Sequence, residues 1–117
     1  MTVRSVQRVL VPLVLAAVVL SGCGSAASPT ASPAPAEVIA RGEELFQRTA
    51  GGRGCAACHG RDARGKGGAP SIVGRPGNSI RGALQRVPQM SFISLTDNEV
   101  EAVAAYLQYL RSQADNP

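Results

Sequence analysis

Tryptophan is absent from the 117-residue chain, and histidine occurs only once. The three cysteines are too few for the disulfide framework of a small secreted miniprotein. Segments that alternate apolar and polar residues, as half-buried strands do, are also missing. The chain is too short for a two-domain enzyme, a Rossmann fold or a barrel. These absences predict one small all-α domain.

Charge of one sign is in only slight excess. The formal net charge is +4, and Arg4 and Arg8 lie in a segment that the mature protein is expected to lose. Nucleic acid is therefore not an expected partner. The remaining charges are distributed unevenly, because residues 41–86 are mainly basic and residues 87–117 are mainly acidic.

The N-terminus has the pattern of an export signal. A short basic segment precedes the 12-residue apolar run Val9–Leu20, which only Pro12 interrupts. A bilayer span needs about 20 residues, so this run is interpreted as the core of a signal peptide.

The next motif, Leu20-Ser21-Gly22-Cys23, resembles the lipobox of bacterial lipoproteins. The resemblance implies a lipoprotein signal peptide over residues 1–22, cleavage before Cys23, and a lipid on the Cys23 sulfur. Such a protein is exported and lipid-anchored on the extracytoplasmic face of a bacterial membrane, with the cell membrane as the first expectation. An ordinary signal peptide cut nearby, leaving Cys23 as a free thiol, is the alternative.

Residues 23–36 are almost entirely Ala, Ser, Pro and Gly, which is typical of an extended linker. Residues 37–117 are the part that can fold, and a domain of this size is near the lower limit for a purely hydrophobic core. Its aromatic residues are few: Phe46, Phe92, Tyr106 and Tyr109. A bulky prosthetic group is expected to complete the core.

Three helices are predicted. The first covers residues 37–49, because apolar or small residues share one helical face: Val38, Gly42, Leu45, Phe46 and Thr49. Residues 96–99 form a capping box, which predicts a helix from there to about Ser112. A shorter helix is expected over residues 79–86, before Pro88.

Residues 60–77 contain six glycines and two prolines. So long a loop in so small a domain needs a physical reason. Wrapping a cofactor would provide one.

The chemistry is concentrated in Cys55-Ala56-Ala57-Cys58-His59. Two thiols at this spacing in a helical turn can form thioethers to the two vinyl groups of one haem, while the adjacent imidazole reaches the iron. A structural zinc site is an alternative, but it needs about four ligands and His59 is the only histidine. A redox-active disulfide between Cys55 and Cys58 is another, but the βαβ pattern of thioredoxin-like proteins is missing.

Residues 37–113 resemble a class I c-type cytochrome with a single haem. The motifs that carry the resemblance are Gly42-x-x-Leu45-Phe46, Gly54-Cys55-Ala56-Ala57-Cys58-His59-Gly60, the glycine-rich loop with Pro70, Met90-x-Phe92 and Ala105-Tyr106-Leu107. The resemblance implies the small cytochrome c fold, with three to four helices around one covalent haem c and its iron. It also implies that the first and last helices cross, with Gly42 and Phe46 against Val103 and Tyr106.

The resemblance assigns His59 and Met90 as the axial iron ligands. Met90 lies 31 residues after His59, and Lys66 is the leading substitute ligand. The Pro70 carbonyl is expected to accept a hydrogen bond from the His59 ring, which would orient the imidazole. Arg75 and Arg81 are both candidates to hold the haem propionates.

Two axial ligands would leave no open iron position, so an electron carrier is expected rather than an enzyme. The expected partners are a quinol-oxidising complex, a dehydrogenase or a terminal oxidase, and a monomer is expected from the small size. A haem enzyme or gas sensor with an open sixth position, or a fixed haem subunit of a dehydrogenase, are the alternatives.

The lipobox makes a direct prediction. A Cys23→Ala variant cannot carry the thioether-linked lipid, so it should move from the membrane fraction to the soluble fraction. Fractionation followed by immunodetection measures this. Continued membrane attachment of the variant would contradict the lipoprotein assignment.

Overall fold

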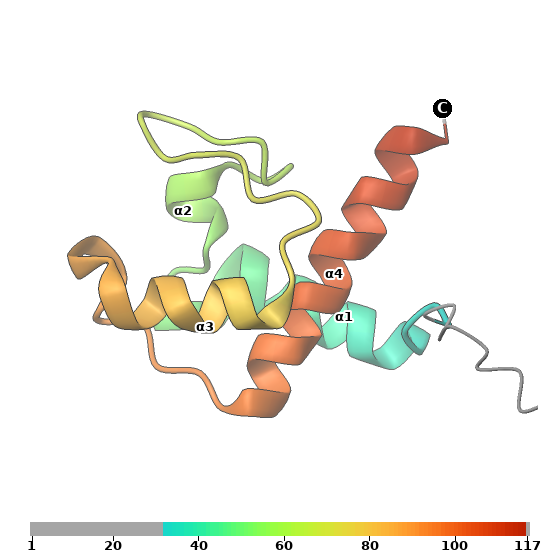
Figure 1. Ribbon diagram of the computed structural model, residues 1–117, viewed down its shortest axis with the longest axis horizontal. Coiled ribbons are helices and arrows are strands. Elements are labelled where there is room, and N and C mark those ends of the chain that lie inside the picture. The colour runs from blue at the N-terminus through green and yellow to red at the C-terminus, as the bar shows by residue number, and fades with distance from the viewer. Residues whose placement is uncertain (1–31, 117) are drawn as a thin grey trace, which may run out of the picture. The chain divides into compact units, whose positions relative to one another are not determined.

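The computed structural model describes residues 32–116, so the predicted signal peptide over residues 1–22 and the predicted lipid on Cys23 lie outside the described residues. The described part contains the helices α1 (Ala36–Glu44), α2 (Ala56–His59), α3 (Gly77–Arg86) and α4 (Asp97–Asp115). It contains no strand, only an isolated bridge between Lys66 and Ala69. The all-α prediction is therefore confirmed (Figure 1). No helix between residues 32 and 116 is long and apolar enough to cross a membrane.

The first predicted helix is present, but its last turn is wider than a regular α-helix. α1 continues into a π-helical turn, Leu45–Thr49, in which the Ala50 amide bonds to the Leu45 carbonyl. A π-helical turn adds a residue and so shifts the buried face. Thr49, which was expected on that face, is exposed, whereas Ala50 is 2% exposed.

The capping box at the start of α4 is confirmed. The Thr96 hydroxyl accepts a hydrogen bond from the Glu99 amide at 3.3 Å, and Glu99 accepts one from the Thr96 amide at 3.0 Å. The Thr96 hydroxyl also donates to this carboxylate at 3.1 Å, and the bonds from the Thr96 amide and hydroxyl, together with Arg41 at 3.0 Å, lower the pKa of the Glu99 carboxyl. α4 ends at Asp115, three residues beyond the predicted end.

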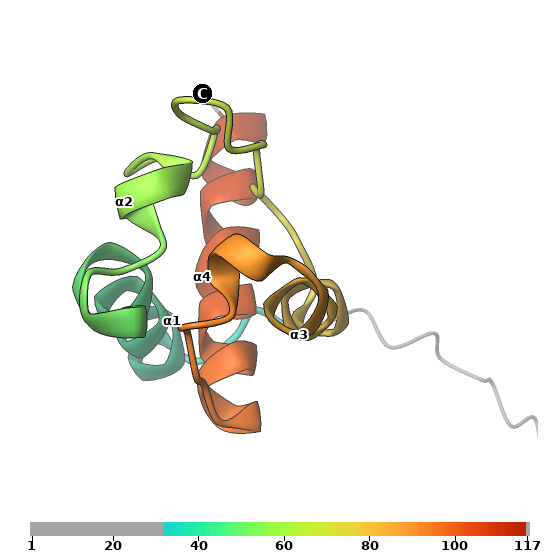
Figure 2. The same cartoon turned by 90° about the vertical axis from the view of Figure 1, so that its left-hand side faces the viewer.

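α1 and α4 pack against each other (Figure 2), and they are in close contact at Gly42, as the resemblance implies. A Cβ placed on Gly42 would overlap the Ala102 carbonyl oxygen and lie 2.9 Å from the Tyr106 Cβ. The Phe46 and Tyr106 rings meet beside this point, with centroids 5.5 Å apart. Val103 is buried in the same core, but Gly42 itself contacts Ala102 and Tyr106.

α3 packs on α4 and begins two residues earlier than predicted. The long loop between α2 and α3 is tied to α4 at its far end. The Gly74 amide donates to the Leu107 carbonyl at 3.0 Å, and the Gln108 side chain donates to the Gly74 carbonyl at 2.6 Å. The loop is therefore anchored where it enters α3.

Substitution of Gly42 tests the helix crossing. Gly42→Ala should lower the free energy of unfolding by about 1–3 kcal/mol, because the new methyl group must displace backbone of α4. The matched control is Gly82→Ala in α3, where the new methyl group would meet only the mobile end of Arg86. The control should be neutral or stabilising by up to about 1 kcal/mol. Urea denaturation of both variants measures the difference, and equal stability would contradict the close crossing.

Candidate functional site

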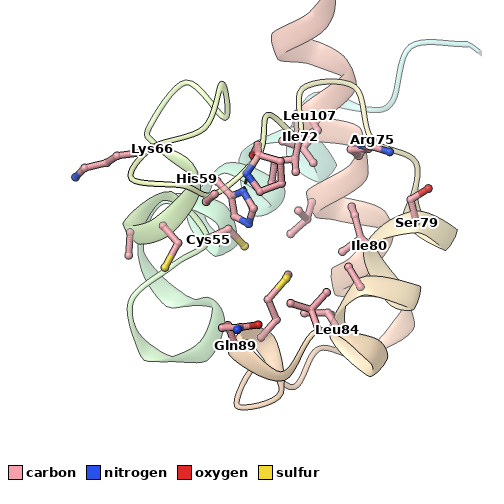
Figure 3. A pocket seen from close by; sticks show the side chains of 18 of the residues that line it. Cys55, His59, Lys66, Ile72, Arg75, Ser79, Ile80, Leu84, Gln89 and Leu107 are labelled. Atoms are coloured by element: carbon pink, nitrogen blue, oxygen red, sulfur yellow. Dashed lines mark hydrogen bonds between the residues drawn. The ribbon is translucent and has the colours of Figure 1, made fainter.

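A cavity of about 900 Å³ lies between α2, the loop that follows it, α3, the segment before α4 and the middle of α4 (Figure 3). This volume is within the usual range for a bound cofactor. Its apolar lining comes from all of these segments and includes Ile72, Ile80, Leu84, Leu95, Val103 and Leu107. The cavity can therefore shield a large apolar group from water.

α2 places three chemically active side chains at the cavity: Cys55, Cys58 and His59. The helical turn closes with a hydrogen bond from the His59 amide to the Cys55 carbonyl at 2.9 Å. Gly60 ends it with φ 81°, a conformation that favours glycine. Both cysteines are free thiols, and Cys55 is half-buried whereas Cys58 is exposed.

The His59 ring is buried and has a defined orientation. Its Nδ1 lies 2.9 Å from the Pro70 carbonyl oxygen, which is the contact expected from the sequence. A carbonyl can only accept, so Nδ1 carries the proton and donates. In the neutral imidazole this hydrogen bond leaves Nε2 with the lone pair that can bind a metal.

Met90 lines the same cavity from a short 3₁₀ turn, Pro88–Met90, directly after α3. Its amide donates to the Val87 carbonyl at 2.9 Å. Its neighbour Gln89 lies across the cavity from His59 (Figure 3). Lys66 also contributes to the lining, but its side chain extends away from the cavity. The structure thus brings Met90 and His59 to one cavity, while the Lys66 amine points elsewhere.

The two candidate arginines have different surroundings. Arg75 lines the cavity on the side where Ser79 lies (Figure 3). Arg81 lines a separate pocket of about 260 Å³ and forms ion pairs with Asp97 at 2.9 Å and with Glu101 at 3.4 Å. Of these two, Arg75 is the one positioned to meet a ligand in the large cavity.

The cysteine environment bears on the alternative uses of this site. Burial raises the pKa of the Cys55 thiol to about 11. Catalytic thiols in redox motifs have a lowered pKa instead, so the environment does not favour a reactive dithiol. Between residues 32 and 116, no three His, Cys, Asp or Glu side chains gather where they could hold a metal ion.

Some residues in and around the cavity carry no signal in the sequence. Ile72 lies in the irregular loop, so it belongs to no periodic pattern. Gln47 was also missed, although its side chain bonds to the Arg61 carbonyl at 2.8 Å and to the Tyr106 hydroxyl at 3.0 Å. Contacts of this kind join segments that are far apart in the chain, so spacing alone does not reveal them.

The thiol environment predicts unequal reactivity. At pH 8, about one Cys55 thiol in a thousand would be ionised, since its pKa is about 11. In the folded chain with both thiols free, iodoacetamide should therefore label the exposed Cys58 well before Cys55. Mass spectrometry of timed samples measures the two rates. In denaturant the rates should converge, and equal rates in the folded chain would contradict the burial of Cys55.

The chain matches no family model, no curated protein and no solved structure. Its functional assignment therefore depends on the residues and the geometry of the cavity. The informative combination is two thiols, one oriented imidazole and one thioether around a single apolar space.

Proposed function

We propose that this chain is a membrane-tethered monohaem cytochrome c that carries single electrons between respiratory redox partners. The observation that carries the proposal is the meeting of Cys55, Cys58, His59 and Met90 at one cavity of about 900 Å³. The all-α arrangement, with α1 and α4 crossing at Gly42, is consistent with the small cytochrome c fold.

The residues present suit a haem chemically. Cys55 and Cys58 would form the two thioether bonds to the vinyl groups, and the half-buried Cys55 sulfur suits an uncharged thioether. His59 would bind iron through Nε2, because Nδ1 donates to the Pro70 carbonyl. Met90 would supply the second axial ligand as a soft thioether sulfur.

A bound haem would supply a one-electron Fe(II)/Fe(III) couple. Since His59 and Met90 would fill both axial positions, the residues provide no place for a substrate at the metal. The apolar lining would limit the contact of a bound haem with water, and an apolar environment together with methionine ligation would favour the reduced state. Electron transfer without bond making is therefore the activity that this cavity supports best.

Arg75 is proposed to bind a haem propionate. A guanidinium group matches a carboxylate with two parallel hydrogen bonds. Arg75 follows Gly74, which two hydrogen bonds fix to α4, so the backbone before Arg75 is held in place. Arg81, already engaged by Asp97 and Glu101, would have to leave these partners before it could take this role.

The proposed setting follows from the sequence. A lipid on Cys23 would hold the domain near the extracytoplasmic face of a bacterial membrane, through the linker that ends at residue 36. Partners within reach would be membrane-bound redox proteins, such as a quinol-oxidising complex, a dehydrogenase or a terminal oxidase.

Visible spectroscopy tests the proposal. The protein produced with haem-maturation machinery should give a low-spin c-type spectrum, and carbon monoxide should leave the reduced spectrum unchanged. Met90→Ala should open the sixth position, so that carbon monoxide now shifts the spectrum, while Lys66→Ala should behave as the unsubstituted protein does. Absence of covalent haem would overturn the proposal. A carbon monoxide shift in the unsubstituted protein would favour a haem enzyme or gas sensor.

The arginine assignment predicts unequal effects on the midpoint potential. A positive charge near the haem favours the reduced, less positive state, so Arg75→Gln should lower the potential by the equivalent of about 1 kcal/mol. Arg81→Gln should leave the potential close to that of the unsubstituted protein, because Arg81 is paired with Asp97 and Glu101. Equilibrium redox titration measures both. A larger effect of Arg81→Gln would reverse the assignment.

A further inference from the structure

One side chain joins three separate parts of the chain behind the cavity. Gln47 lies in the π-helical turn after α1 and is half-buried. Its Nε2 donates to the Arg61 carbonyl at 2.8 Å and to the Tyr106 hydroxyl at 3.0 Å. One amide nitrogen therefore connects the end of α1, the segment just after His59, and the middle of α4.

The same turn also contacts the segment on the other side of the cysteines. Gly54, with φ 77°, packs directly on the turn, and a Cβ placed there would lie 2.5 Å from the Gln47 carbonyl carbon and from the Phe46 oxygen. The Gly54 amide bonds to the Ala50 carbonyl at 2.9 Å. Both ends of the segment from residue 54 to residue 61 are thus held by the π-helical turn.

Residue 47 makes this double contact from within the widened turn. A regular α-helix has 3.6 residues per turn and would rotate later residues to other directions. In the π-helical form, residue 47 has its backbone against Gly54 and its side chain between Arg61 and Tyr106. π-helical turns occur often at functional sites, which agrees with this placement.

We propose that Gln47 is a positioning residue for His59. It holds the carbonyl two residues beyond His59, while Pro70 holds the His59 ring from the other side. The turn in between is closed by hydrogen bonds from the Gly65 amide to the His59 carbonyl at 2.8 Å and from the Ala63 amide to the Gly60 carbonyl at 3.1 Å. Without the Gln47 amide, this turn would lose its connection to α4 through Tyr106, and the His59 imidazole would be less firmly oriented. The proposal rests on the haem function proposed above, where His59 binds iron.

The test compares Gln47→Leu with two controls on the haem-loaded protein. Thr96→Ala removes the capping box of α4, so it serves as a control for the loss of stability expected in Gln47→Leu. Gln113→Leu makes the same substitution at an exposed site on α4 and controls for the change of side chain. The readouts are the midpoint potential and the proton NMR shifts of the haem methyl groups in the oxidised protein, which depend on the orientation of the axial imidazole.

Only Gln47→Leu should change the pattern of methyl shifts and the midpoint potential, whereas both Gln47→Leu and Thr96→Ala should lower the melting temperature. If Gln47→Leu does not fold, Gln47→Glu decides the matter. A carboxylate can still accept a hydrogen bond from Tyr106, but it cannot donate to the Arg61 carbonyl. Methyl shifts in the folded Gln47 variant that match those of Gln113→Leu would overturn the proposal.

Amide hydrogen exchange separates this proposal from the haem function. If the unsubstituted protein carries no covalent haem, the proposed function fails. The positioning role of Gln47 can still be tested on the haem-free protein and its variants, because the exchange rate of the Gly65 amide reports how firmly the turn after His59 is held. That rate should rise more than about tenfold in Gln47→Leu relative to Thr96→Ala. Equal rates in the two variants would overturn the positioning role.

Discussion

The close crossing of α1 and α4 at Gly42 is the constraint on which the rest of the domain depends. Because Gly42 has no side chain, the backbone of α1 at this residue packs directly against the backbone of α4 at Ala102. Phe46 and Tyr106 then pack ring against ring, and both are buried. A domain with so few aromatic residues concentrates two of them at this point, and the crossing forms the base on which the other segments are placed.

The cysteine and histidine segment is held in position on this base by contacts from three sides. The π-helical turn supports Gly54 and Arg61, and Pro70 holds the His59 ring through its carbonyl. The loop that carries Pro70 is fixed in turn to α4 through Gly74. A short helix of four residues therefore has a defined orientation, although it is too short to be stable alone.

The predictable features were those with a local cause. The capping box at Thr96 and Glu99 and the helix before Pro88 depend on neighbours within one or two turns, and each was found. The prediction for Thr49 was wrong, because the helical period changes at the π-helical turn. That change accompanies the packing of Gly54 against the turn, which a periodic pattern does not contain.

The sequence by itself determined the all-α class, the residues able to do chemistry, and the start of α4 at its capping box, since these follow from residue types and short spacings. Only the tertiary structure decided that Arg75 lines the large cavity while Arg81 pairs with Asp97 and Glu101. It also decided that Gln47 connects Arg61 to Tyr106. The physical reason is the same for both: a guanidinium or an amide has many possible partners, and the partner it takes depends on which distant segments the packing of α1, α3 and α4 brings within reach.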